Sequence, residues 1–169
     1  MAQVKRVGYA MQALAWLSFM VVGVLFFGDR LESQYNPNRH VDSRTSNAIS
    51  EVTLQRNRLG HYVTSGSINA QPVTFLLDTG ATGVAIPARI ANDLKLKRGR
   101  PIATRTANGT VTSYQTSLNT VSIGDIGLEN VGATVAPGLR GDEILLGMSF
   151  LKHIEFTQRG DTLILRQYQ

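Results

Sequence analysis

The chain has 169 residues, enough for one ordinary domain with an appendage but too few for two catalytic lobes. Hydrophobic residues make up 43% and charged residues 17% of the sequence, which excludes both a disordered chain and a polytopic membrane protein. The absence of cysteine excludes disulfide scaffolds, thiol catalysis and cysteine-ligated metal sites. The net charge is +5, and its densest basic cluster lacks interleaved aromatic residues. This cluster predicts a solvated turn rather than a nucleic-acid surface, and comprises Lys95, Lys97, Arg98 and Arg100.

The first predicted element is a transmembrane helix. The stretch from Val7 to Gly28 carries no formal charge. As a helix of about 22 residues it would extend about 33 Å, which spans a hydrocarbon core of about 30 Å. Lys5 and Arg6 precede the stretch, so the positive-inside rule places the N-terminus in the cytoplasm. We therefore expect a single-pass anchor in the inner (cytoplasmic) membrane, with residues 7–28 in the bilayer and the following domain periplasmic or extracellular.

Two other interpretations of this stretch fit its pattern less well. A cleavable signal peptide has an apolar region of about 7 to 15 residues that ends in a small-residue cleavage site. Here the apolar region is longer, and Phe26-Phe27-Gly28 is a poor cleavage site. A buried helix of a soluble protein would carry a polar face, which this stretch lacks.

A change of composition divides the rest of the chain. Residues 29–58 are polar and show no sustained helical or strand period, which predicts a flexible tether. Residues 59–169 contain short Val, Ile, Leu and Thr runs between glycine-containing breaks, which predicts a compact all-β domain, barrel-like or sandwich-like. The expected strands are His61–Ile68, Val73–Leu77, Val84–Pro87, Ile102–Thr106, Val111–Ser117, Thr120–Ile123, Leu128–Ala136, Ile144–Leu146, Ile154–Thr157 and Thr162–Leu165.

Two short helices and one clear hairpin complete the predicted elements. Ala88–Leu94 places Ile90 and Leu94 on one helical face, and a second short helix is expected over Met148–His153. Asn108-Gly109 separates two strand-like runs, and both residue types tolerate the positive φ of a type I′ turn.

The usual cofactor and metal patterns do not occur. His40, His61 and His153 are scattered, with no carboxylate at ligand spacing, so we expect surface or packed histidines and no metal site. The sequence also lacks the nucleophile-elbow, P-loop and dinucleotide-binding motifs, and we expect no cofactor.

The segment that ends in Asp78-Thr79-Gly80 stands out chemically. Val73, Phe75 and Leu77 alternate onto one strand face, and the strand then ends in a carboxylate, a hydroxyl and a glycine. Burial of such a carboxylate is costly unless it has hydrogen-bond partners. The tripeptide by itself fits either an Asx turn that Asp78 caps or a functional carboxylate.

The neighbouring sequence resembles that of retropepsin-like (clan AA) aspartic proteases. Residues 75–82 resemble their active-site loop, and residues 144–151 resemble their second hallmark, a hydrophobic run and a glycine that lead into a short helix. Thr106–Thr110 falls where the family has its flap hairpin. The resemblance covers residues 59–169, is closest to single-lobe, membrane-anchored bacterial members, and implies a closed β-barrel.

The resemblance also implies a mechanism. Two carboxyls must share a proton, and this chain has one such loop, so a homodimer with one Asp78 per chain is expected to activate the hydrolytic water. The substrate would be an extended peptide or protein segment. Thr82 stands where retroviral relatives commonly have Asp, so the contact made there is not transferred. The implied site consists of catalytic Asp78, the loop residues Thr79, Gly80, Ala81 and Thr82, the flap residues Ala107, Asn108 and Gly109, and Gly147 beneath the loop.

Two alternatives to a membrane-tethered aspartic endopeptidase stay open from the sequence. The first is a catalytically silent retropepsin-like module that binds peptides, with Asp78 as a structural cap. The second is a membrane-anchored β-rich envelope adaptor in which Asp78-Thr79-Gly80 is only a turn. Asp78 would be dispensable in the adaptor and essential in the protease.

Overall fold

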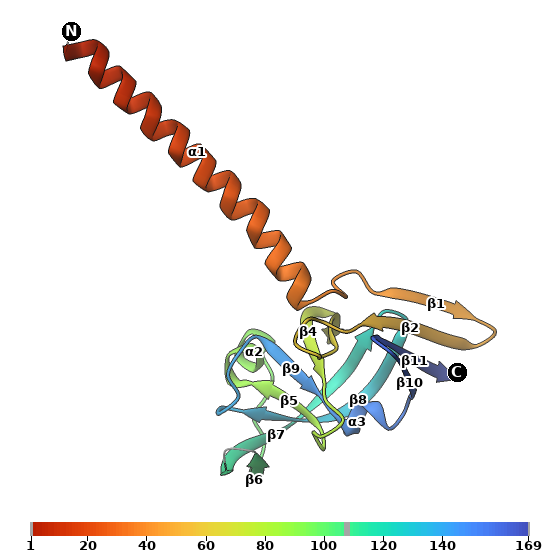
Figure 1. Cartoon of the computed structure of the whole chain (residues 1–169). Coiled ribbons are helices and arrows are strands. Elements are labelled where there is room, and N and C mark those ends of the chain that lie inside the picture. The colour runs from red at the N-terminus through yellow and green to blue at the C-terminus, as the bar shows by residue number, and fades with distance from the viewer. Residues whose placement is uncertain (1, 107–108, 169) are drawn as a thin grey trace.

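The computed structural model describes residues 2–106 and 109–168, and consists of a long N-terminal helix that projects from a β domain (Figure 1). Helix α1 (Ala2–Tyr35) exposes large apolar side chains around its circumference. Within it, Met11–Tyr35 is long and apolar enough to cross a membrane.

The prediction of a flexible tether over residues 29–58 is wrong. Helix α1 continues past Gly28 to Tyr35, and strands β1 (Asp42–Ser46) and β2 (Ile49–Gln55) form an antiparallel hairpin. The turn residues Asn47 and Ala48 both have positive φ, which matches a tight hairpin turn. Val52 and Leu54 alternate into the core, so β2 belongs to the folded domain.

The main sheet closes on itself, which confirms the predicted all-β barrel. Its strand order is β3-β4-β9-β5-β8-β7-β6, and an additional β3–β7 pairing completes the closure. Gly66 permits this closure, because a Cβ there would lie 2.4 Å from the Ser122 carbonyl oxygen. The strands are β3 (Val63–Ile68), β4 (Gln71–Leu77), β5 (Val84–Pro87), β6 (Pro101–Thr106), β7 (Gly109–Ile123), β8 (Ile126–Ala136) and β9 (Glu143–Leu146).

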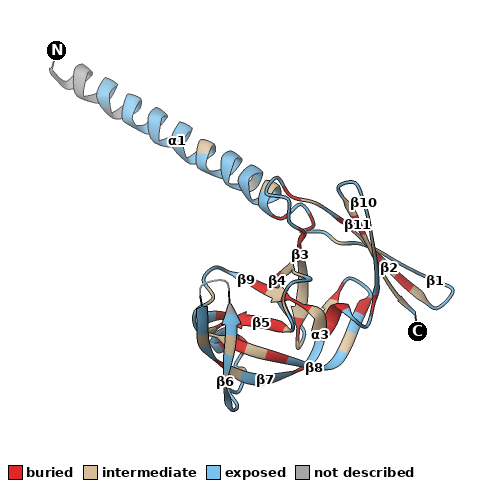
Figure 2. Ribbon diagram, turned by 60° about the horizontal axis from the view of Figure 1, so that its bottom comes forward, coloured by how far each residue is buried: buried red, intermediate tan, exposed pale blue. Residues whose placement is uncertain are grey.

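The strands of this barrel carry many buried residues, which are coloured red in Figure 2. The largest fully buried ones include Phe75, Ile86, Leu118, Ile144 and Phe150. They come from β4, β5, β7, β9 and the helix after β9, so one core connects all the elements that surround the Asp78 loop.

A second sheet, of order β1-β2-β11-β10, includes the C-terminal strands β10 (Glu155–Arg159) and β11 (Thr162–Tyr168). Arg166 on β11 forms an ion pair with Glu51 on β2 at 2.7 Å. The Tyr168 hydroxyl donates to Glu155 at 2.7 Å, and this hydrogen bond raises the pKa of Tyr168. Strand β10 is one of the two edges of this sheet, with one side unpaired among the described residues.

The two predicted short helices are confirmed as α2 (Ala88–Asp93) and α3 (Met148–Leu151). Each predicted strand lies within an observed strand or overlaps one, with small shifts at the ends. The runs 111–117 and 120–123 were expected as separate strands but belong to the single strand β7, which continues through Leu118 and Asn119.

Candidate active site

Strands β4 and β9 position the Asp78 loop. They pair in parallel, with Leu77 opposite Leu146, so both strands end at the same edge of the sheet. The Asp78 N–H donates to the Leu146 carbonyl at 3.2 Å, and the Leu77 N–H donates to the Tyr62 carbonyl at 3.0 Å. The backbone on both sides of Asp78 is therefore fixed by the barrel.

The loop itself is a tight turn organised by Asp78. Its Oδ1 accepts a hydrogen bond from the Gly80 N–H at 2.8 Å, and its carbonyl accepts one from the Ala81 N–H at 3.2 Å. Asp78 is half-buried, whereas Thr79, Gly80 and Thr82 are exposed. In one chain the turn thus presents a carboxylate and a hydroxyl toward solvent.

Gly147 lies beneath this loop at a close crossing of two backbones. A Cβ at this position would lie 2.5 Å from the carbonyl oxygens of both Ala81 and Gly83. The Met148 N–H donates to the Ala81 carbonyl at 2.9 Å. Because Gly147 has an extended backbone, with φ −97°, space rather than conformation requires a glycine here.

Ser149 is a structural support that the sequence analysis did not identify. Its Oγ accepts from the Val84 N–H at 3.1 Å and donates to the Gly132 carbonyl at 3.1 Å. Helix α3 is thereby tied to β5 and β8 just after the Asp78 loop. The available signal was a hydroxyl residue two positions after Gly147, at the start of a predicted helix.

A groove of about 360 Å³ opens beside Asp78 and Thr79. Its other wall is the β10–β11 sheet, which contributes Phe156 and Gln158. Phe156 is 41% exposed. The buried Tyr62 hydroxyl has no hydrogen-bond partner among the described residues, and Tyr62 also lines the groove.

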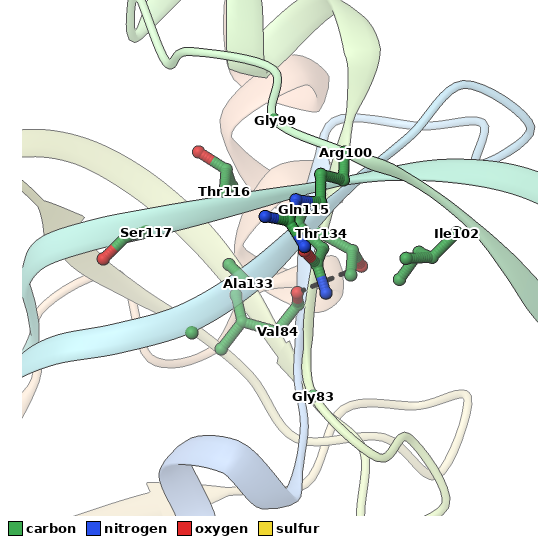
Figure 3. Close-up of a pocket in the computed structure, with 11 residues that line it drawn as sticks. Gly83, Val84, Gly99, Arg100, Ile102, Gln115, Thr116, Ser117, Ala133 and Thr134 are labelled. Atoms are coloured by element: carbon green, nitrogen blue, oxygen red, sulfur yellow. Dashed lines mark hydrogen bonds between the residues drawn. The ribbon is translucent and has the colours of Figure 1, made fainter.

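A larger, more open hollow of about 570 Å³ begins at Gly83 and Val84, where the loop leads into β5 (Figure 3). Arg100, Gln115 and Thr134 gather beside Val84, and the Thr134 hydroxyl donates to the Val84 carbonyl at 3.4 Å. Asp78 does not line this hollow, so the smaller groove is the one that borders the carboxylate.

The predicted flap corresponds to the hairpin of β6 and β7, which pair from Pro101 opposite Tyr114 to Thr106 opposite Gly109. Gly109 has a φ of +109°. Ala107 and Asn108, the other two predicted flap residues, lie outside the described residues. Within the described part of the chain, no group of three His, Asp or Glu side chains is placed to hold a metal ion.

Comparison with known families identifies this arrangement. A family model described as "gag-polyprotein putative aspartyl protease" matches residues 64–153, which include the Asp78 loop and Gly147. The chain belongs to this aspartyl protease family.

A solved structure shares the fold of this family member. The crystal structure of a retropepsin-like aspartic protease from Rickettsia conorii superposes with a TM-score of 0.59 at 29% identity. The match covers 75% of this chain and 94% of that protein. The expected retropepsin-like fold is therefore confirmed.

The sequence is also similar to that of two proteins from Sinorhizobium and Rickettsia. An uncharacterized protein of a Sinorhizobium species is 36% identical over 144 residues, covering 83% of this chain and 62% of that protein. An uncharacterized protein of Rickettsia prowazekii (strain Madrid E) is 28% identical over 166 residues, covering 93% of this chain and 71% of that protein. The chain thus spans less than two thirds of the Sinorhizobium relative.

Proposed function

We propose that the protein is a membrane-tethered aspartic endopeptidase, active as a homodimer, that cleaves extended peptide segments on the periplasmic or extracellular side of the membrane. The proposal rests on the partly exposed Asp78-Thr79-Gly80 turn, which is fixed between β4 and β9 over the crossing at Gly147. The support that this turn receives from the paired strands β4 and β9, and from the backbone at Gly147, favours a functional carboxylate over an Asx turn of purely structural use.

The chemistry requires two carboxyls at one site. One acts as the base toward a bound water while the other protonates the carbonyl oxygen of the scissile peptide bond. Like charges at such short separation cannot both ionise cheaply, so the pair shares a proton and titrates as a unit. Asp78 supplies one carboxyl per chain, and its twin in a second copy supplies the other.

The surface around Asp78 is suited to a second copy. The groove between Asp78 and Phe156 leaves apolar surface exposed, and the buried Tyr62 hydroxyl on its wall would gain a partner from a polar group of the occupant. Strand β10 offers its unpaired edge next to this groove. Antiparallel pairing of two β10 edges is compatible with a two-fold axis, which would bring the two Asp78 loops toward each other.

Peptide binding is expected between the Asp78 loop and the β6–β7 hairpin. An extended substrate can pair its backbone with strand edges while its side chains enter neighbouring pockets. The hollow at Val84 and Ile102 is suitable for such a side chain. The hairpin would close over the peptide and exclude water from the reacting bond.

The decisive experiment measures cleavage of a peptide library by the full chain in detergent or nanodiscs, at acidic and neutral pH. Asp78→Asn should abolish cleavage, whereas Asp93→Asn, an exposed carboxylate on α2, should leave it unchanged. Wild type and Asp78→Asn are then mixed in equal amounts, dissociated and reassembled. If each active unit needs two Asp78 residues, the mixture keeps about a quarter of the wild-type activity, whereas independent monomers would keep about half.

The results separate the alternatives. Cleavage that persists in Asp78→Asn would exclude Asp78 as the catalytic group. Wild type that binds library peptides but never cleaves them would support the silent peptide-binding module. Wild type that does neither, even when dimerised through its N-termini, would support the envelope adaptor.

A further inference from the structure

An exposed leucine lies where the anchor helix meets the domain. Beyond α1, the large apolar side chains that the described residues expose are Leu59, Phe156 and Tyr168. Phe156 lines the groove beside Asp78, and Tyr168 is bonded to Glu155. Leu59 is 69% exposed and takes part in neither arrangement. Because a single exposed leucine needs no explanation by itself, its place in the fold decides whether it has a role.

Asn57 attaches the Leu59 turn to the end of α1. The Asn57 side chain is buried, and its Oδ1 accepts from the N–H groups of Leu59 at 3.0 Å and His61 at 2.9 Å. Its Nδ2 donates to the Tyr35 carbonyl, in the last turn of α1, at 3.0 Å. One amide therefore shapes the turn and binds it to the helix terminus.

The junction between α1 and the domain is fixed rather than flexible. Asn38 is 4% exposed, and its Nδ2 donates to the carbonyls of Gln55 at 2.9 Å and Val63 at 2.7 Å. Its Oδ1 accepts from the Gln55 N–H at 2.7 Å. Asn36, 6% exposed, donates to the Ser65 hydroxyl at 3.2 Å. These bonds tie the residues after α1 to β2 and β3, so the helix direction sets the orientation of the domain.

The level of this junction matches the surface of a bilayer. From Gly28, the end of the uncharged stretch, to Tyr35 the helix rises about 10 Å, somewhat more than the roughly 5–8 Å of one headgroup layer. The Leu59 turn, bound to Tyr35, thus lies at the outer edge of that layer. Arg58 precedes Leu59, is exposed, and has no ion-pair partner within the described part of the chain.

We infer that the Arg58-Leu59-Gly60 turn docks on the membrane surface, with Leu59 inserted among the lipid headgroups and Arg58 bound to anionic phosphates. The inference rests on the membrane anchoring proposed above and adds a second, peripheral contact to it. Apolar insertion combined with attraction between cationic side chains and anionic lipid is the usual basis of interfacial binding. Together with the fixed junction, this contact would hold the domain against the bilayer at a constant height.

The test uses site-specific fluorescence in the full-length protein, which has no native cysteine to compete for the label. Single variants Leu59→Cys, Val22→Cys and Thr112→Cys carry an environment-sensitive dye and are reconstituted into vesicles of phosphatidylcholine and phosphatidylglycerol. Nitroxide quenchers are placed either at the headgroup or deep in the acyl chains. Val22 reports on α1 in the bilayer, and Thr112 lies on the β6–β7 hairpin, at the end of the domain far from α1 (Figure 1).

We expect deep quenching at Val22→Cys, headgroup quenching at Leu59→Cys and several-fold less quenching at Thr112→Cys. If Val22→Cys is quenched but Leu59→Cys matches Thr112→Cys, the docked turn is excluded while the anchor stands. If Val22→Cys is not quenched, the anchor fails and the docked turn fails with it.

A second variant tests the role of the junction. Asn57→Ala in the Leu59→Cys background should lower headgroup quenching toward the Thr112→Cys level, with the domain still folded by circular dichroism. Unchanged quenching in folded Asn57→Ala would contradict positioning of the turn by α1. If Asn57→Ala does not fold, Leu59→Asp and Arg58→Glu, with the dye at His61→Cys, replace it; quenching at that dye that neither substitution lowers would overturn the proposal.

Discussion

Gly147 approaches Ala81 so closely that a Cβ at position 147 would lie 2.5 Å from the Ala81 carbonyl oxygen. The contact joins the two hallmark segments of the site, because Ala81 belongs to the Asp78 loop and Gly147 ends the run of β9. The loop that carries Asp78 therefore rests on a backbone segment more than sixty positions away in the sequence.

Gly147→Ala should destabilise the domain by about 2–3 kcal/mol, since the new methyl group must displace backbone atoms and not flexible side-chain ends. Cleavage should fall further than the loss of folded protein explains, because the Asp78 loop moves. Urea unfolding, monitored by far-ultraviolet circular dichroism, measures the loss of stability. Gly132→Ala is the matched control, because a Cβ there meets nothing within 4 Å. Equal stability of Gly147→Ala and wild type would refute the tight crossing.

Ser149→Ala removes one hydroxyl that serves two backbone groups, the Val84 N–H and the Gly132 carbonyl. We expect a loss of about 1–2 kcal/mol, because the N–H of the buried Val84 would be left without its hydrogen-bond partner. Hydrogen exchange should show faster exchange of the Val84 amide in particular. Ser46→Ala, at an exposed position of β1, should change neither quantity. Unaltered protection of Val84 would contradict this role of Ser149.

Asn38→Ala should cost about 2–3 kcal/mol, since it leaves the carbonyls of Gln55 and Val63 and the Gln55 N–H without their partner. The expected readout is lower thermal stability together with faster amide exchange in β2 and β3. Asn119→Ala, at an exposed position of β7, provides the control. A flexible tether would predict no difference between the two variants.

Phe156→Arg should abolish self-association while leaving the fold of each chain intact. Phe156 is partly exposed on the edge strand β10 and lines the groove beside Asp78, so a charge there opposes burial by a second copy. Sedimentation in matched-density detergent measures the oligomeric state. Thr112→Arg introduces the same charge away from the groove and should remain dimeric. A dimer that survives Phe156→Arg would place the interface elsewhere.

The stability contributed by the Tyr168 side chain should depend on pH. The hydrogen bond to Glu155 and its negative charge raise the pKa of Tyr168 above the ordinary value of 10.0. A pKa that is higher in the folded state means that the contribution is complete below pH 10 and is lost as the pH rises through the folded-state value. Wild type should therefore exceed Tyr168→Phe in stability at pH 8, and the two should converge at high alkaline pH. A difference that does not vary with pH would exclude this linkage.

Much of the site was predictable because its signals are local. The alternation of Val73, Phe75 and Leu77 identifies a strand, and the polar residues after it mark a candidate functional loop. The hydrophobic run before Gly147 identifies the second segment in the same way. Each pattern depends on side-chain periods and turn chemistry that neighbouring residues determine among themselves.

The segment after α1 could not be predicted, because its structure depends on distant partners. Residues 29–58 have a polar composition and no long period, yet Asn36, Asn38 and Asn57 are buried, where each hydrogen-bonds to groups far away in the chain. From sequence alone, polar residues of this kind are predicted to be exposed to solvent, because their distant hydrogen-bond partners are not known.

The sequence by itself thus determined the strands after residue 59, the anchor-like helix, and the loop that carries Asp78, because these follow from hydrophobic periodicity and local turn preferences. Only the tertiary structure decided that β3 and β7 close the barrel, that Ser149 holds β5, and that α1 joins the domain through a rigid, hydrogen-bonded junction. These features arise from contacts between residues far apart in the chain, whose free energy depends on packing and burial that no local pattern encodes.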